Sequence, residues 1–297
     1  MTIEAEALRV LAPAKINLFL HVGDKRSDGF HALQSLVVFA RMGDELALSP
    51  DRDIKVVASG RFAAGLPPAG QNLVHKAARA LAQHAGITRG AYISLKKNLP
   101  VSSGIGGGSA DAAAALRGLA RLWNLKVEHD VLRQIGETLG SDVPVCVACR
   151  PQWMEGRGET LAQVESVPAV QIVLVNPRVG VATKDVFAAL KDRRGTGQPR
   201  PPAMRTTGDL VAFLKDTTND LEAPARAVAP VISDVLREIA AQPGVLLTRM
   251  SGSGATCFGL FGDPDDAARA ALTIGEGHPS WWVSATATTP VLSAALA

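Results

Sequence analysis

Pro100-Val-Ser-Ser-Gly-Ile-Gly-Gly-Gly-Ser-Ala-Asp111 decides the fold, because it places four glycines, at 104, 106, 107 and 108, between two regular elements. Apolar residues at 91–96 predict a strand before it, and the alanine-rich run 109–123 predicts a helix after it. Glycine lets a backbone adopt positive φ and approach a ligand closely. A helix that starts from such a turn presents free N–H groups and the positive end of its dipole, which favours phosphate.

This glycine-rich stretch differs from two familiar phosphate-binding motifs. No Gly-Lys-Ser/Thr follows the glycines, so it is not a Walker A loop, and Ser109 takes the third glycine position of a dinucleotide fingerprint. A flexible connection is the simplest alternative, but four glycines in five positions between a strand and a helix argue against it. The stretch predicts a phosphate site and leaves the reaction open.

Outside this stretch, apolar periodicity predicts strands and helices in mixed order, which indicates the α+β class. Further strands are expected at 8–22, 32–39, 44–48, 53–58, 143–149, 170–175, 245–250, 256–261 and 282–286. Further helices are expected at 72–85, 131–139, 185–190, 208–213, 227–241 and 264–272. The Pro-, Gly- and Arg-rich segment 192–205 is expected to be a mobile loop and is a candidate lid.

Length and composition indicate a globular protein of two domains. The chain has 297 residues, of which 47% are hydrophobic and 20% charged. A change of composition near 151–159 predicts a division into 1–158 and 159–297. The net charge is only +3 and the basic residues are scattered, apart from the 191–205 loop. This pattern favours a small anionic substrate over nucleic acid.

Three cysteines argue against a disulfide framework and for a reducing compartment. Cys146 and Cys149 have redox-motif spacing, but their apolar surroundings favour a place in the core. The first ten residues lack the apolar centre of a signal peptide, and 279–297 is expected to form a final strand and tail, without a membrane span. We therefore expect a cytoplasmic protein.

Three segments in this order resemble the GHMP kinase superfamily, which includes galactokinase, homoserine kinase and mevalonate kinase. They are Ala12-Pro-Ala-Lys-Ile-Asn-Leu18, the glycine-rich stretch, and Arg249-Met-Ser-Gly-Ser-Gly-Ala255. Asp28-Gly-Phe-His31 and Gly140-Ser-Asp-Val-Pro144 are most similar to the members that phosphorylate a cytidine diphosphate-linked polyol in the non-mevalonate isoprenoid pathway. The resemblance spans nearly the whole chain.

The resemblance implies a two-domain GHMP kinase fold. Its N-terminal half would be like ribosomal protein S5 domain 2, its C-terminal half an α/β sandwich, and its active site would lie in the cleft between them. It implies ATP and Mg²⁺, a polyol substrate phosphorylated on its 2-hydroxyl, and a monomer or homodimer that binds neither nucleic acid nor membrane. Two alternatives stay open: another kinase of the superfamily, acting on homoserine or mevalonate, and a nucleotide- or RNA-binding module without catalysis.

The resemblance also assigns catalytic and nucleotide-binding residues. Asp142, at the mouth of the predicted 143–149 strand, is the expected general base, and Lys15 its cationic partner. Ser109 is the candidate hydroxyl ligand for a metal, since the family often has serine where this chain has Ala110. The expected nucleotide contacts are Pro100, Val101, Ser102, Ser103, Gly104, Ile105, Gly106, Gly107, Gly108, Ser109 and Ala110.

Five residues are expected to contact the substrate. Phe30 and Phe187 would stack on the base, His31 would hydrogen-bond its edge, Asn17 would be a further contact, and Thr183 would touch the diphosphate. Both phenylalanines are equally consistent with core packing. The Ser251–Ala255 segment is expected to support the wall of the active site as a tight turn between strands.

Overall fold

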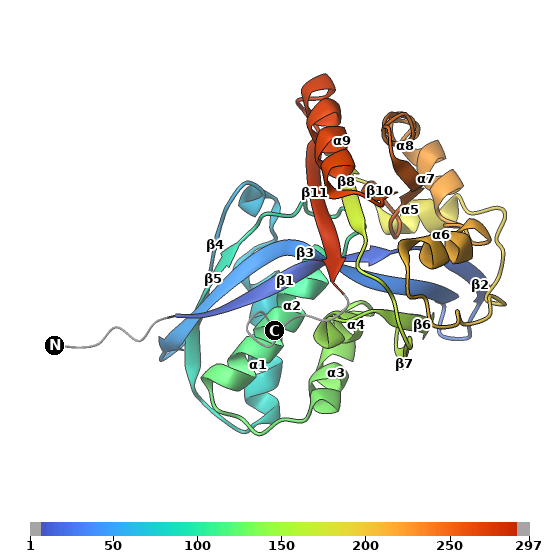
Figure 1. Cartoon of the computed structure of the whole chain (residues 1–297). Helices are drawn as coiled ribbons and strands as arrows, with labels where there is room; N and C mark the ends of the chain where they lie inside the picture. Colours follow the sequence, from blue (N-terminus) through green and yellow to red (C-terminus); the bar gives the residue numbers. More distant parts are fainter. Residues whose placement is uncertain (1–6, 290–297) are drawn as a thin grey trace.

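A computed structural model describes residues 7–289, and within this range eleven strands form one continuous sheet with helices packed on it (Figure 1). The strands are β1 (Leu8–Asn17), β2 (His21–Lys25), β3 (His31–Asp51), β4 (Ile54–Ser59), β5 (Gly90–Lys96), β6 (Gln152–Gly156), β7 (Thr160–Gln163), β8 (Gln171–Asn176), β9 (Val245–Met250), β10 (Cys257–Phe261) and β11 (Trp282–Thr289).

Nine α-helices and two short 3-10 turns accompany the strands in the described range. The helices are α1 (Leu73–His84), α2 (Gly107–Leu122), α3 (His129–Glu137), α4 (Val143–Ala148), α5 (Thr183–Ala188), α6 (Thr207–Lys215), α7 (Glu222–Val228), α8 (Val231–Ala240) and α9 (Pro264–Gly277); the turns are η1 (Ala63–Gly65) and η2 (Ala69–Gln71). This mixed architecture confirms the predicted α+β class and the GHMP kinase fold.

The long strand β3 organises the N-terminal half. It pairs antiparallel with β1, β2, β5 and β6, and it joins the C-terminal half where Thr288 and Thr289 of β11 pair with Ala40 and Phe39. The sequence predicts two strands here, but the pairing continues through Gly43. A side chain at Gly43 would collide with the backbone of Ala12, so glycine is what allows β1 and β3 to stay in contact.

Helices α1, α2, α3 and α4 cover one face of the N-terminal half and form one core cluster with β1, β3 and β5. The predicted strand at 143–149 is wrong, because Val143–Ala148 forms the helix α4. A short apolar run with every residue buried fits a core strand or a core helix equally well. Pro144 in the first turn decides for the helix, because proline suits that position.

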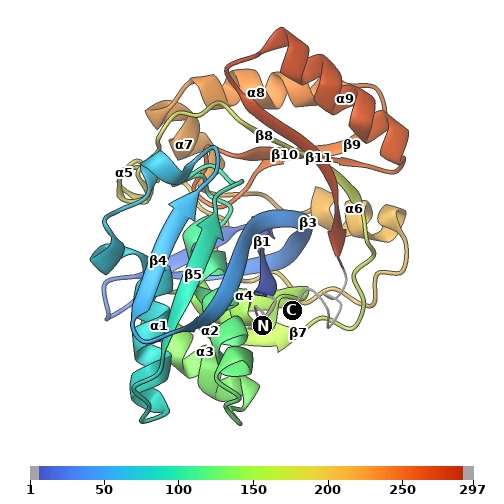
Figure 2. The same cartoon turned by 90° about the vertical axis from the view of Figure 1, so that its left-hand side faces the viewer.

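The C-terminal half is an antiparallel sheet in the order β11-β8-β10-β9. Helices α7, α8 and α9 cover one face, while α6 and part of the N-terminal half pack against the other. Helices α8 and α9 therefore lie at the opposite end of the molecule from α1, α2 and α3 (Figure 2). The single helix predicted at 227–241 is two helices, since Pro230 separates α7 from α8.

One further region differs from the sequence-based expectation. Strands β6 and β7 were not predicted, and they pair with each other while β6 also pairs with β3. The division of the chain at residue 158 stays a prediction.

The 192–205 segment contacts strands β2 and β3. The Arg193 side chain pairs with Asp24, and the Gln198 N–H donates to the side chain of Gln34.

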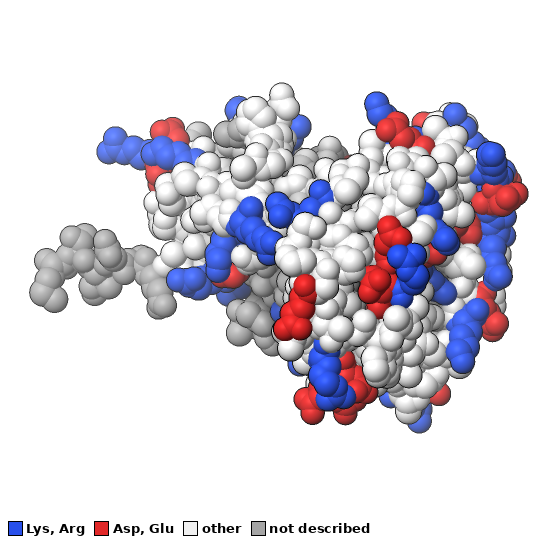
Figure 3. All heavy atoms as spheres, turned by 90° about the horizontal axis from the view of Figure 1, so that it is seen from above, with Lys and Arg blue, Asp and Glu red and all other residues white. Residues whose placement is uncertain are grey.

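Charged side chains of both signs are interspersed over the face seen in Figure 3. Within residues 7–289, no helix combines the length and apolar character needed to cross a membrane. The tail expected at 290–297 lies outside the described residues.

Candidate active site

The glycine turn that connects β5 to α2 adopts the backbone that its sequence predicts. Gly104 and Gly106 have φ values of +78° and +62°, in the left-handed region that favours glycine. Gly106 is the N-cap of α2, so the next N–H groups, at 107, 108 and 109, have no acceptor within the helix. These groups and the helix dipole form an anion site at the start of α2.

A second glycine turn, at 251–255, holds the first one in place. The Thr256 N–H donates to the Ser103 carbonyl at 3.0 Å, and the Ser251 hydroxyl donates to the Gly104 carbonyl at 3.2 Å. A Cβ at Gly104 would lie 2.5 Å from the Ser251 carbonyl oxygen, so the two turns touch backbone to backbone. The 251–255 turn therefore packs directly against the first glycine turn and holds its backbone.

Lys15 and Asp142, 127 residues apart in the chain, meet beside the first glycine turn. The Lys15 Nζ lies 2.8 Å from the Asp142 Oδ2. The register between β1 and β3 shifts at this point, because β3 has the extra residues between Phe39 and Gly43, opposite Lys15 and Pro13. The Lys15 N–H also donates to the Ile105 carbonyl at 3.0 Å, which ties the lysine to the turn.

The environments of the two partners differ. The side chain of Lys15 is 4% exposed, whereas that of Asp142 is 35% exposed. Asp142 is the N-cap of α4, so the strand at whose mouth the sequence analysis placed it is wrong. Its role as general base stays a prediction. Its carboxylate faces the cleft and is open to a substrate.

A cleft of about 810 Å³ brings the predicted residues together. It is lined by β1, the glycine turn, the start of α4 and the 180–183 and 252–254 segments of the C-terminal half. Of the predicted nucleotide contacts, all line the cleft except Ile105 and Ala110, whose side chains are buried in the core. The hydroxyl that the family often carries at 110 would therefore face the core in this chain.

The predicted substrate residues also line the cleft, but their rings pair differently from the prediction. His31 stacks on Phe187 with centroids 5.5 Å apart and planes 23° apart, whereas Phe30 is 53% exposed and lies under the Arg157 guanidinium. The His31 Nδ1 lies 3.0 Å from the Gly23 carbonyl, which orients the ring.

Asn17 and Thr183 occupy opposite walls of the cleft. The Asn17 Nδ2 donates to the Ser35 hydroxyl at 2.8 Å, and its Oδ1 is a buried oxygen without a hydrogen-bond partner among the described residues. Thr183 begins α5, and its hydroxyl lies 2.9 Å from that of Ser253. Asn17 thus offers an acceptor, and Thr183 and Ser253 a pair of hydroxyls, to a ligand between the halves.

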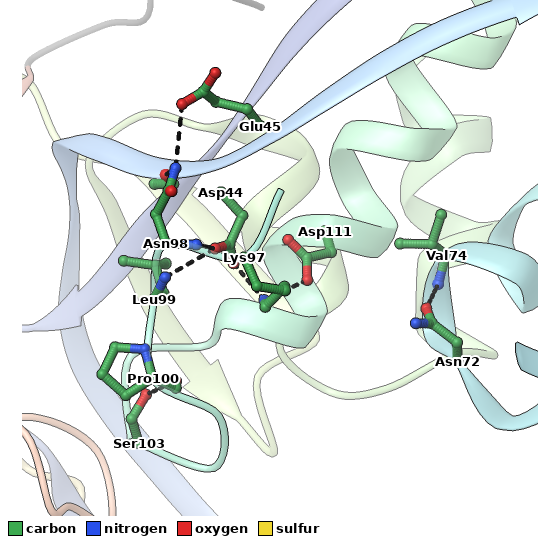
Figure 4. Close-up of polar contacts among 11 residues, drawn as sticks. Asp44, Glu45, Asn72, Val74, Lys97, Asn98, Leu99, Pro100, Ser103 and Asp111 are labelled. Carbon is green, nitrogen blue, oxygen red and sulfur yellow. Dashed lines mark hydrogen bonds and ion pairs between the residues drawn. The ribbon is translucent and has the colours of Figure 1, made fainter. Parts of the chain in front are cut away.

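Sequence reasoning missed a buried ion cluster behind the turn. Lys97 contacts Asp44 and Asp111, and all three side chains point toward one another in Figure 4. Lys97 and Asp111 line the cleft. The signal in the sequence is faint: a lysine at the end of a predicted strand, and an aspartate in the first turn of an apolar helix.

Burial controls the protonation of this cluster. Burial raises the pKa of Asp111 to about 8, although the Lys97 charge opposes the shift. Burial alone would lower the pKa of Lys97, but the carboxylates of Asp111 and Asp44 outweigh it and the pKa is raised. Lys97 is therefore a fixed cation.

Comparison with known proteins agrees with this geometry. Two family models match the chain, GHMP kinases N terminal domain over residues 72–150 and GHMP kinases C terminal over residues 202–279. A homoserine kinase structure from Cytophaga hutchinsonii shares the fold, with a TM-score of 0.70 over 97% of this chain and 96% of that one at 20% identity.

The three proteins compared next are more similar to this chain than the homoserine kinase is, and all three are named as the same enzyme. 4-Diphosphocytidyl-2-C-methyl-D-erythritol kinase of Paramagnetospirillum magneticum is 48% identical, covering 92% of this chain and 95% of its own length, and that of Dinoroseobacter shibae is 50% identical over 93% of both. A crystal structure of 4-(cytidine 5'-diphospho)-2C-methyl-D-erythritol kinase has a TM-score of 0.74 at 31% identity, covering 95% of this chain and 99% of that one. The chain therefore belongs to the 4-diphosphocytidyl-2-C-methyl-D-erythritol kinase family of the GHMP kinases.

Proposed function

We propose that this protein transfers the γ-phosphoryl group of ATP to the 2-hydroxyl of 4-diphosphocytidyl-2-C-methyl-D-erythritol. The observation that carries the proposal is the 2.8 Å contact between Lys15 and Asp142 beside the glycine turn. A module that only binds nucleotide or RNA needs no paired acid and base at its anion site. The family relationship supports the identity of the substrate.

Asp142 is the general base in this proposal. Its carboxylate accepts the proton of the substrate hydroxyl while the oxygen attacks the γ-phosphorus, the bond to the bridging oxygen breaks, and ADP leaves. Such a base contributes roughly 10²–10⁴-fold to the rate. The Lys15 ammonium, 2.8 Å from that carboxylate, offsets negative charge that develops on the transferring group.

The glycine turn is the proposed site of the nucleotide phosphates. The free N–H groups at 107–109 and the α2 dipole would hold the phosphates in line with the hydroxyl next to Asp142. Phosphoryl transfer depends mainly on such positioning and on charge stabilisation. The two supporting hydrogen bonds from the 251–256 segment keep this turn rigid.

A magnesium ion fits this site if the nucleotide supplies most of its ligands. The described residues include no group of three or more His, Cys, Asp or Glu side chains that could bind a metal ion. Magnesium is commonly held by phosphate oxygens and few protein ligands, and Ser109 presents a hydroxyl oxygen at the cleft beside the turn. The ion would neutralise charge on the phosphates.

The cytidine part of the substrate fits the aromatic end of the cleft. His31 and Phe187 form a stacked pair there, and Phe30 is an exposed ring at the same end. Stacking of a base on such rings contributes roughly 1–3 kcal/mol. The free Asn17 Oδ1 can accept a hydrogen bond from a substrate hydroxyl, and the Thr183 and Ser253 hydroxyls can contact the diphosphate.

A substrate panel tests the proposal. Purified protein is incubated with ATP and Mg²⁺ and with the cytidyl substrate, homoserine or mevalonate, and ADP formation is measured. We expect turnover with the cytidyl substrate alone, because homoserine and mevalonate carry no base to stack. Equal or faster turnover of either small alcohol would favour the other GHMP kinases, and no ADP from any of the three would remove the kinase assignment.

A further inference from the structure

Lys97 is a buried cation that the proposed reaction does not use. Its ammonium contacts Asp44 of β3 and lies 2.6 Å from the Oδ2 of Asp111, and the side chains of all three residues are at most 3% exposed. Figure 4 shows the three groups converging below the start of α2. A buried charge of this kind needs an explanation, because desolvation makes it costly.

The cluster lies directly beneath the turn proposed to bind phosphates. A Cβ placed on Gly107, the first residue of α2, would lie 3.6 Å from the Lys97 Nζ. The same Cβ would lie 3.7 Å from the Asp44 Oδ2, so the ammonium and one of its carboxyl partners lie together next to the first residue of the helix. The position of the Lys97 ammonium is therefore set by the two carboxyl groups that hold it.

Asp44 and Asp111 differ in how many of their carboxyl oxygens have hydrogen-bond partners. Asp44 has partners on both oxygens, since its Oδ1 accepts the N–H groups of Asn98 and Leu99 at 2.6 and 2.9 Å. The Oδ1 of Asp111 is buried without a hydrogen-bond partner among the described residues, although Asp111 lines the cleft. Asp44 holds the backbone at residues 98 and 99, which explains why it is buried. Asp111 holds no backbone segment in this way, so its burial needs another explanation.

We propose that Asp111 is a positioning residue for the nucleotide, which acts through Lys97 by holding its ammonium beneath the first turn of α2. This inference rests on the proposed function, because it takes the glycine turn as the phosphate site. With Asp111 in place, the ammonium is fixed between β3 and α2. Without it, Asp44 alone holds the ammonium, which can move away from α2 and the phosphates.

The test compares two substitutions of Asp111 by steady-state kinetics. Asp111→Leu removes the acceptor for Lys97 at similar size, and Asp111→Asn keeps the shape and an acceptor oxygen. We expect Asp111→Leu to raise KM for ATP about tenfold or more, while kcat and KM for the cytidyl substrate change less than about threefold, because uniform binding of the phosphates is lost. Asp111→Asn should stay within about threefold of the wild type.

The matched control is Asp130→Leu, the same change in the first turn of α3, where the aspartate side chain is 80% exposed. It should leave both KM values and kcat unchanged. If Asp111→Leu does not fold by circular dichroism, Asp111→Ser, which also lacks the carboxyl, is held to the same criterion. A wild-type KM for ATP, or parallel losses in kcat and both KM values, overturns the inference.

Failure of the inference and failure of the proposed function give different results. If the function is wrong, the wild-type protein itself forms no ADP with the cytidyl substrate. If only the inference is wrong, the wild type turns over and the Asp111→Leu variant binds ATP as well as the wild type does.

Discussion

Two lysine–carboxylate clusters border the same glycine turn, and they differ in their exposure to solvent. Lys15 pairs with one carboxylate, that of Asp142, which is 35% exposed at the cleft. Lys97 is enclosed by two carboxyl groups, those of Asp44 and Asp111, and all three side chains are at most 3% exposed. The residue types are the same, and the chemistry open to each cluster is different.

This difference separates reaction from positioning. A general base must reach the proton that it accepts, and the exposed Asp142 can do so. The side chains of the Lys97 cluster are at most 3% exposed, and their burial makes their interactions strongly coupled and fixed in place. One cluster is suited to transfer a proton, and the other to hold the helix that binds phosphate.

The largest expected effect comes from the exposed cluster. Asp142→Asn should lower kcat by about 10²–10⁴-fold, because the carboxylate that accepts the hydroxyl proton is lost. ATP binding, measured by calorimetry with a non-hydrolysable analogue, should persist. The free energy of unfolding should change by about 1 kcal/mol or less, since pairs with an exposed partner contribute little.

Asp130→Asn is the control for this experiment, because it neutralises an exposed aspartate outside the cleft. Turnover of Asp142→Asn close to that of the control would mean that the transfer needs no base at this position. That result would be physically reasonable, because phosphoryl transfer through a loose transition state depends mainly on positioning and charge stabilisation.

The next effect is on stability and comes from the buried cluster. Lys97→Met removes the cation from two buried aspartates and should lower the free energy of unfolding by about 3–5 kcal/mol. Lys15→Met, which has a partner open to solvent, should cost about 1 kcal/mol. Urea denaturation of both variants measures the two losses, and equal losses would contradict the distinction between the clusters.

The pH dependence of stability isolates Asp111. Its pKa in the folded protein is about 8 against a reference of 3.8, so the folded state holds the proton more tightly than the unfolded state. The proton on Asp111 therefore adds to the free energy of unfolding. This stabilisation is complete below the reference pKa of 3.8 and is lost as the pH rises through about 8. The wild type should lose up to about 1.4 kcal/mol per pH unit relative to Asp111→Asn in that window.

Urea denaturation from pH 5 to 9 measures both proteins in the same buffers. Other titrating groups contribute equally to both, so the difference between the profiles reports Asp111 alone. Parallel profiles would show that Asp111 titrates as an ordinary carboxyl.

The sequence predicts the site where the signal is local. Gly104 and Gly106 have the positive φ that a glycine-rich turn predicts, and the helix expected from residue 72 begins there, with the Asn72 side chain accepting the Val74 N–H at 2.8 Å. The meeting of Lys15 and Asp142 could be expected only from the resemblance to GHMP kinases, because no local pattern relates residues 127 positions apart.

The buried cluster could not be predicted, because it depends on strand register. Asp44 meets Lys97 only because β3 pairs with β5 so that Glu45 lies opposite Lys96, and a shift by one residue would turn Lys97 to the other face. The pairing of His31 with Phe187 likewise depends on the packing of the two halves. Local propensity carries no information on either arrangement.

The smallest expected effect concerns the lysine next to Lys97. Lys96 pairs with Glu45 across the same two strands at 3.2 Å, but its side chain is 55% exposed and that of Glu45 47% exposed. Lys96→Gln should lower the free energy of unfolding by about 0.5 kcal/mol or less and leave kcat and both KM values unchanged. Urea denaturation and the kinase assay measure this directly. Because Lys96 ends β5 and Lys97 follows it directly, a loss as large as that of Lys97→Met would show that strand pairing, rather than burial of the charges, sets the stability of this region.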